Sequence, residues 1–306
     1  SFGMIMILQR VLPCVFLALL AACSDGSDHK SATNIDSSDP QVFIASNGDV
    51  VLQLEGRTLF AMPGNKAPLA REFTESAFGI GVIGFTRKDE TVDPLNLTES
   101  QQVGAGVKLD FRNADGSRQA SLEARPVSAQ ETLFRFTLTG TSADSIAVPV
   151  RCDSGGSFHG FGEQYNATDQ RGEAFGLFVN EQGNGRTGSG GISGDEHTTY
   201  FPMPYYLDVR GFGVLFDTAR RVQLDLCAAD PAVAWIEVIG GDAIEWTVFH
   251  GPTGKDVVRQ LADEVGRPAK PPEWAYGLWI GSQGGRDKAL AEVAALEAAD
   301  IPVTAL

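Results

Sequence analysis

The chain has 306 residues, of which 43% are hydrophobic and 21% are charged, proportions typical of a globular protein of about two domains. It carries 24 basic and 39 acidic residues, a formal net charge of −15. This balance argues against a nucleic-acid-binding surface, which needs clustered lysine and arginine. It fits solubility outside the cytoplasm better than any specific partner. The 35 glycines suit a β-rich chain with many tight turns.

The N-terminus has the features of a secretory signal peptide. Arg10 precedes the apolar run 11–20, and small residues then lead to Cys23. The run is too short to span a bilayer comfortably as a mature helix. A cysteine after small residues resembles the bacterial lipoprotein box, which implies a signal peptide over 1–22, lipid attachment to Cys23 and a lipid anchor in the bacterial cell envelope, on the outer membrane or periplasmic face. The alternative is an ordinary signal peptide with a chance cysteine. Residues 23–40 are polar and indicate a solvated tether.

Two cysteines, Cys152 and Cys227, remain for the folded part, because Cys14 lies in the signal. They could pair in an oxidising envelope. Two widely separated cysteines are weak grounds for a disulfide, however, and we expect two buried thiols instead.

Alternating apolar residues indicate β-strands over 41–252. The alternation is clear at Val107, Leu109 and Phe111, at Phe134, Phe136 and Leu138, and at Val222, Leu224 and Leu226. A hairpin is predicted around the turn 240–242, with Ile236 and Val238 before it and Ile244, Trp246 and Val248 after it. Many such strands separated by turns predict a large antiparallel β-sandwich.

The apolar period changes to that of a helix at Thr253. The sequence TGKD resembles a capping box, with Thr253 placed to accept a hydrogen bond from the first turn. One helical face carries Val257, Val258, Leu261 and Val265. Gly266 and the prolines after it end the helix, so 253–272 is expected to be a connector of helix and proline-rich linker.

The last segment, 273–306, shows the pattern strand, glycine-rich turn, helix and strand. Residues 274–280 form the nearly unbroken apolar run expected of a strand buried on both faces. Asp287 can cap a helix over 288–299, and 303–306 begins another strand. The inner side of this helix carries Leu290, Val293 and Leu296. One parallel βαβ unit cannot bury both faces of its sheet, so we expect an N-terminal fragment that stops inside a domain.

Two long motifs suggest chemistry. Residues 158–186 contain GFGEQY and NEQGNGR, and residues 271–285 read PPEWAYGLWIGSQGG, with YFPMPYYLDVRGFGVLFDT between them. In this order they resemble glycoside hydrolase family 31, which contains α-glucosidases and α-xylosidases. The segments EQGNGR and QGG are most similar to its sulfoquinovosidase branch. The similarity covers roughly 158–306.

The resemblance implies both a fold and a function. The fold is a mainly β chain: a galactose-mutarotase-like antiparallel sandwich over 41–252, followed over 273–306 by the truncated start of a (β/α)8 barrel. The function is that of a retaining α-glycosidase that hydrolyses O-glycosyl bonds, of α-glucoside or sulfoquinovoside type. Such an enzyme needs two carboxyl groups, which the family places on later barrel strands. No catalytic residue is therefore expected in this chain, and the fragment by itself is expected to be inactive.

The resemblance also implies a partial rim for a carbohydrate substrate, neutral or anionic. Trp279 and Gln283 end the first barrel strand, on the face where such barrels place their sites. A tryptophan there can stack on a sugar, and an amide can bond hydroxyls or a sulfonate oxygen. Glu181, Gln182 and Arg186 belong to a sandwich loop over the barrel mouth, where an arginine suits an anionic substituent.

Each of these residues also has a structural interpretation. Trp279 can be barrel packing, Gln283 can cap a turn, and the sandwich loop can serve only as bracing, with Glu163 and Gln164 as its anchors. No metal or cofactor site is expected, because the four histidines lack metal-ligand spacing. The alternative function is a carbohydrate-binding β-sandwich lipoprotein without hydrolase activity, which would have no use for a βαβ unit.

Overall fold

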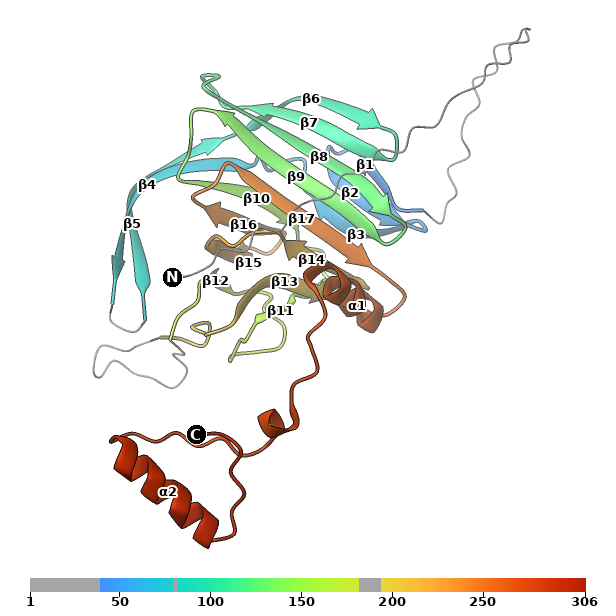
Figure 1. Ribbon diagram of the computed structural model, residues 1–306. Coiled ribbons are helices and arrows are strands. Elements are labelled where there is room, and N and C mark those ends of the chain that lie inside the picture. The colour runs from blue at the N-terminus through green and yellow to red at the C-terminus, as the bar shows by residue number, and fades with distance from the viewer. Residues whose placement is uncertain (1–38, 80–81, 182–193) are drawn as a thin grey trace, which may run out of the picture. The chain divides into compact units, whose positions relative to one another are not determined.

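The computed structural model describes residues 39–79, 82–181 and 194–306 (Figure 1). The predicted signal peptide over 1–22 and the lipid attachment at Cys23 lie outside the described residues. Within the described part there are seventeen strands in three sheets, and every strand pair is antiparallel. The predicted antiparallel sandwich is therefore confirmed.

Hydrogen bonding sets the order of the strands across each of the three sheets. The three-stranded sheet contains, in that order, β1 (Gln41–Ile44), β2 (Val50–Leu54) and β3 (Arg57–Met62). The six-stranded sheet contains β12 (Ala174–Leu177), β15 (Val222–Asp230), β16 (Val233–Ile239), β10 (Ser145–Arg151), β4 (Leu69–Phe78) and β5 (Gly84–Pro94). The eight-stranded sheet contains β11 (His159–Gly162), β13 (Pro202–Asp208), β14 (Phe212–Phe216), β17 (Ala243–His250), β9 (Glu131–Gly140), β8 (Arg118–Ser128), β7 (Gly106–Arg112) and β6 (Asn96–Val103).

One hydrophobic core joins all three sheets. The alternation along β9 and β17 directs Phe134 and Trp246 inward, where their rings stack at 5.2 Å. Phe60 of β3 meets Phe134 edge-on at 5.2 Å, and Ile146 and Ile236 of the six-stranded sheet belong to the same cluster. Because strand period and burial coincide, the apolar side chains named from the alternation are buried.

The predicted hairpin around 240–242 is wrong, although both of its strands form. β16 pairs with β15 and β10, whereas β17 pairs with β14 and β9, so the turn passes from one sheet to the other. Gly240 N donates to Asp144 O at 2.7 Å, which ties the turn to the six-stranded sheet. Asp242 O accepts from Leu138 N at 2.6 Å, which ties it to the eight-stranded sheet. Alternating apolar residues would face the same core in a hairpin within one sheet and in a connection between two packed sheets. The sequence pattern therefore cannot distinguish the two arrangements.

The predicted connector helix forms as α1 (Gly254–Val265). Thr253 Oγ1 accepts from Asp256 N at 3.3 Å, as the capping pattern predicts, and Gly266 ends the helix with a φ of +94°. Val257 and Leu261 pack on Tyr205 of β13 and Phe249 of β17. The other two predicted apolar positions, Val258 and Val265, are exposed.

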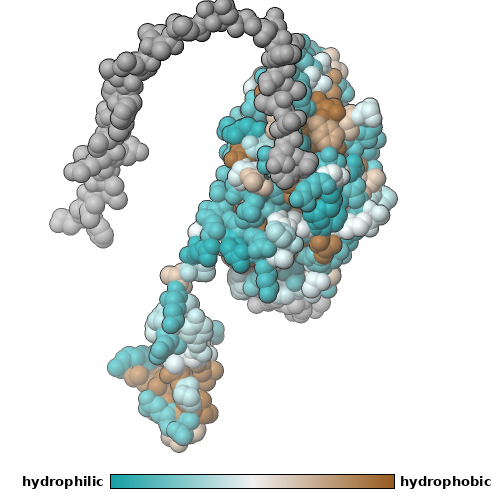
Figure 2. Space-filling view, turned by 90° about the vertical axis from the view of Figure 1, so that its right-hand side faces the viewer, coloured by the Kyte–Doolittle hydropathy of each residue, from teal (hydrophilic) through white to brown (hydrophobic). Residues whose placement is uncertain are grey.

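The predicted strand over 274–280 does not form. Residues Glu273–Tyr276 make a 3₁₀ turn, η1, and a single parallel bridge joins Trp279 to Ala305. The helix forms as α2 (Arg286–Ala298), begins after Gly285 instead of at an Asp287 cap, and buries no side chain. A buried strand needs a paired neighbour and a packed second layer, whereas the described residues give this segment only the bridge from Trp279 to Ala305. Hydrophobic side chains gather on its surface (Figure 2). No helix of the described chain is both long and apolar enough to cross a membrane.

Candidate functional site

The GFG motif of β11 forms a bulge. Phe161 has a φ of +64°, which is costly for a bulky residue, and its neighbours Gly160 and Gly162 have φ values of +144° and +84°. The register between β11 and β13 shifts at this point. A Cβ on Gly162 would lie 1.9 Å from Phe201 O, so only glycine permits this close approach. The bulge directs Phe161 into the core, where it is fully buried and stacks on Tyr206 at 5.6 Å.

The loop after β11, residues 163–173, folds back on Phe158, the residue just before β11. Asp169 Oδ1 accepts from Phe158 N at 2.9 Å, and Gln170 N donates to Phe158 O at 3.0 Å. Gln170 is fully buried, and its Nε2 donates to Asn166 Oδ1 at 2.9 Å. The Gln170 amide nitrogen thus satisfies buried acceptors of its own loop, whereas Gln170 Oε1 and Asn166 Nδ2 have no partner among the described residues.

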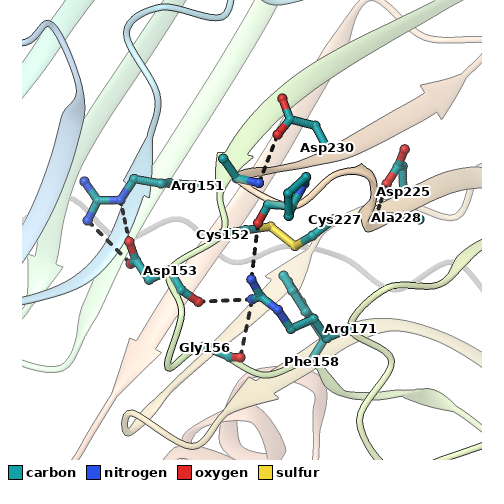
Figure 3. Close-up of a disulfide and its surroundings, with 12 residues drawn as sticks. Arg151, Cys152, Asp153, Gly156, Phe158, Arg171, Asp225, Cys227, Ala228 and Asp230 are labelled. Atoms are coloured by element: carbon teal, nitrogen blue, oxygen red, sulfur yellow. Dashed lines mark hydrogen bonds and ion pairs between the residues drawn. A yellow bond between two sulfur atoms is a disulfide. The ribbon is translucent and has the colours of Figure 1, made fainter.

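Arg171 and a disulfide fix the end of this loop (Figure 3). Arg171 donates to Asp153 O at 3.1 Å and to Pro231 O at 3.3 Å. Beside it, Cys152 and Cys227 form a disulfide with a Cα–Cα distance of 6.4 Å. The prediction of two free thiols is therefore wrong, although both cysteines are buried. Cys227 lies in a bulge of β15 with a φ of +66°, a feature that sequence alternation does not reveal.

Glu163 and Gln164 bond to the described segment that follows the predicted sandwich loop, and most of that loop lies outside the described residues. Thr199 Oγ1 donates to Glu163 Oε2 at 2.8 Å. His197 Nδ1 lies 2.7 Å from Gln164 Oε1, which accepts a hydrogen bond from the ring nitrogen. The His197 ring also stacks on Phe175 of β12 at 4.2 Å, nearly parallel. These contacts join the two chain segments that flank the predicted rim residues of the sandwich.

The structure places the predicted rim residues in two separate parts of the chain. Glu181 accepts a hydrogen bond from Tyr200 OH, whereas Gln182 and Arg186 lie outside the described residues. Trp279 is 59% exposed and stacks on Trp274 at 5.6 Å. Gln283 is exposed in the turn before α2.

Beneath the loop lies a charged network that the sequence patterns did not predict. Arg210 Nη2 donates to Asp208 Oδ2 at 2.8 Å, and its Nη1 donates to Asp153 Oδ2 at 2.6 Å. Burial disfavours the charged form of Arg210, but the bonds to these two carboxylates outweigh it and raise the pKa of Arg210. Burial likewise opposes ionisation of Asp153, yet hydrogen bonds from Arg151 and Arg210 lower its pKa. The only sequence signal was the close spacing of Asp208 and Arg210.

Comparison with known proteins identifies the sandwich. Residues 26–225 match the model of the "Glycosyl hydrolase 31 N-terminal galactose mutarotase-like domain". Alpha-glucosidase 2 of Bacillus thermoamyloliquefaciens is 33% identical over 191 residues, which is 61% of this chain and 22% of that protein. The sulfoquinovosidase of Agrobacterium fabrum is 27% identical over 255 residues, 79% of this chain and 37% of that protein.

A solved structure shows the same fold. A GH31 family sulfoquinovosidase from E. rectale, in complex with an aza-sugar inhibitor, superposes with a TM-score of 0.69 at 18% identity. The match covers 86% of this chain and 40% of that one. The chain therefore spans well under half the length of these relatives.

Proposed function

The chain belongs to glycoside hydrolase family 31, and we propose that it is the N-terminal part of a retaining α-glycosidase that hydrolyses O-glycosyl bonds. The match to the family's N-terminal domain over 26–225 carries this proposal. Curated relatives named as alpha-glucosidase, alpha-xylosidase and sulfoquinovosidase support it. Retaining hydrolysis uses one carboxylate as nucleophile and a second carboxyl group, about 5–5.5 Å away, as acid and base. We assign neither group to this chain.

For the substrate we propose an α-glucoside or a sulfoquinovoside. The alignment with the Agrobacterium fabrum sulfoquinovosidase over 79% of the chain supports the second of these. We propose that Trp279 stacks on a sugar face and that the Gln283 amide bonds its oxygens. Glu181, Gln182 and Arg186 would complete the rim from the sandwich side, with Arg186 facing an anionic substituent.

We also propose export and a lipid anchor on Cys23. The disulfide between Cys152 and Cys227 supports an oxidising compartment, because cytosolic reductants keep thiols reduced. Mass spectrometry of the membrane fraction should find Cys23 as a lipidated N-terminus. An unmodified product in the soluble fraction would contradict the anchor and leave the hydrolase proposal standing.

The hydrolase proposal is tested on the full-length gene product. Incubation with 4-nitrophenyl α-D-glucopyranoside and with 4-nitrophenyl α-sulfoquinovoside should release nitrophenol from at least one of them. Proton NMR should show the α-anomer as the first sugar product, as retention requires. A β-anomer would contradict the retaining mechanism. Sugar binding without hydrolysis of any α-glycoside would favour the carbohydrate-binding lipoprotein instead.

The role of Gln283 is tested in the same enzyme. Gln283→Ala should lower kcat/KM about tenfold, since it removes one or two hydrogen bonds to the substrate. Gln119→Ala, at an exposed glutamine of β8, is the matched control and should leave the rate unchanged. An unaltered kcat/KM in Gln283→Ala would show that Gln283 only caps a turn.

A further inference from the structure

The hairpin of β4 and β5 bends away from its sheet (Figure 1). The pairing of the two strands shifts between Glu72 and Thr74, opposite Asp89, which has a φ of +54°. Near the tip, Ile83 N donates to Asn180 Oδ1 at 2.8 Å, and Asn180 Nδ2 donates back to Ile83 O at 3.0 Å. Since β5 and β12 are opposite edges of the six-stranded sheet, this contact closes the hairpin over the face turned away from the core.

A cleft of about 690 Å³ lies between the hairpin and strands β12 and β15. This volume is in the range of small-molecule binding sites, about 300–1,000 Å³. Side chains able to contact a ligand line it, among them Glu75, Arg87, Phe178, His197, Arg221 and Gln223. Gln223 is exposed on β15, whereas its neighbours Val222 and Leu224 point into the core.

The two arginines of the cleft are held rigidly. The Arg221 guanidinium lies 3.6 Å from the ring centre of Phe85, and its Nη2 donates to both oxygens of Glu75 at 2.5 and 2.6 Å. Arg87 lies 4.1 Å from the ring centre of Phe73, and its Nη1 donates to Glu237 at 2.8 Å. A side chain fixed before binding loses little entropy when a ligand arrives. Among the described residues, Nη1 and Nε of Arg221 have no hydrogen-bond acceptor, and the Arg221 side chain is 11% exposed.

The balance of positive and negative side chains in the cleft indicates which kind of ligand it can bind. Glu75 and Glu237 balance the two arginines, and Asp195 adds another carboxylate to the lining. An anion therefore gains no net attraction, whereas a hydroxyl can accept from a guanidinium or an amide and donate to a carboxylate. Phe178 and Phe78, 39% and 59% exposed, offer apolar faces to carbon-bound hydrogens.

We propose that the cleft between the β4–β5 hairpin and strands β12 and β15 binds an uncharged oligosaccharide. Arg221 and Gln223 provide the hydrogen bonds to its hydroxyls, and Phe178 packs against a sugar ring. This proposal concerns binding alone, so it stands or falls independently of the hydrolysis proposed above.

Calorimetry on the full 306-residue chain tests the site with isomaltotriose, maltotriose and sodium sulfate as probes. At least one trisaccharide should bind saturably, and sulfate should not compete with it. Gln223→Ala and Phe178→Ala should each weaken binding about tenfold, as expected for the loss of a pair of hydrogen bonds or an apolar contact. Gln119→Ala, an exposed glutamine in the eight-stranded sheet, should bind like the native chain.

Three results would overturn the proposal: no saturable binding of either trisaccharide, unchanged binding in both cleft variants, or displacement of the sugar by sulfate. Circular dichroism shows whether each variant is folded. If Gln223→Ala does not fold, Phe178→Ala, at a partly exposed position, decides the outcome.

Discussion

The bulge in β11 predicts that Gly162 tolerates no side chain, for two reasons that can be separated. Its φ of +84° disfavours any residue with a Cβ, and the added Cβ would meet Phe201 O at 1.9 Å. Gly172 has a similar φ of +90° but no atom within 4 Å of the position of a Cβ. Gly155 likewise has open space and lacks a positive φ. Comparing alanine variants at these three positions therefore separates the cost of a positive φ from the cost of the clash with Phe201 O.

The expected magnitudes follow from these geometries. Gly155→Ala should be neutral or stabilise by up to about 1 kcal/mol, because alanine restricts the unfolded chain. Gly172→Ala should lower the free energy of unfolding by about 1 kcal/mol. A Cβ in the left-handed region costs about 1–2 kcal/mol, and the restriction of the unfolded chain by alanine offsets part of that cost. Gly162→Ala adds overpacking of about 1–3 kcal/mol against a backbone oxygen that can move only with β13, for a total of about 2–4 kcal/mol.

Urea denaturation at pH 7 with the disulfide intact measures all three free energies of unfolding. The fluorescence of the fully buried Trp246 reports on the core. If Gly162→Ala lost no more stability than Gly172→Ala, the predicted clash with Phe201 O would be refuted. The positive φ would then be the remaining reason for glycine at this position.

Two further predictions concern the folded domain. Replacing both Cys152 and Cys227 by serine should lower the free energy of unfolding by about 4.5 kcal/mol, the chain-entropy value for a separation of 75 residues. Dithiothreitol should lower the urea midpoint of the native chain and leave that of the variant unchanged, and an unaffected native midpoint would contradict this. His250 is 1% exposed, and burial together with the nearby Arg57 lowers its pKa from 6.5 to about 4. The unfolded chain therefore takes up the proton first, and stability should fall as the pH drops from about 6.5 to about 4. His250→Phe should reduce that fall in urea midpoints measured across this range, and an identical slope in both proteins would exclude His250 as a cause.

The strand alternation was enough to predict the sandwich but not its connections. Trp246 and Ile236 are both buried, as their patterns indicate, yet they belong to different sheets. A period of two in the sequence shows which face of a strand is buried. It gives no information about which other strand pairs with it. The α1 helix was predictable in more detail because its cap, Thr253, and its end, Gly266, act within a few residues.

The site was only partly predictable for the same reason. The motif around Glu163 and Gln164 was located from the sequence, but their partners Thr199 and His197 were not. The cleft was not, because it depends on a bend in the β4–β5 hairpin and on Asn180, which meets Ile83 from 97 residues away. The disulfide was not predicted either, because Cys152 and Cys227 are 75 residues apart and Cys227 lies in a bulge of β15. The cleft and the disulfide both depend on irregular strands, which periodic patterns do not describe.

The described part of the motif over 158–186 has mainly structural roles, and this limits what it says about the substrate. Gly160 and Gly162 permit the bulge, Glu163 fixes the neighbouring segment, and Gln170 satisfies buried polar groups of its own loop. A motif of this kind is required by the fold whatever sugar is bound, so its presence supports the family and is silent on specificity. Specificity must then come from side chains that are free to meet a ligand, and Gln223 and Gln283 are exposed in this way. Substitutions in the motif should therefore change stability, whereas substitutions at these two glutamines should change which sugars bind.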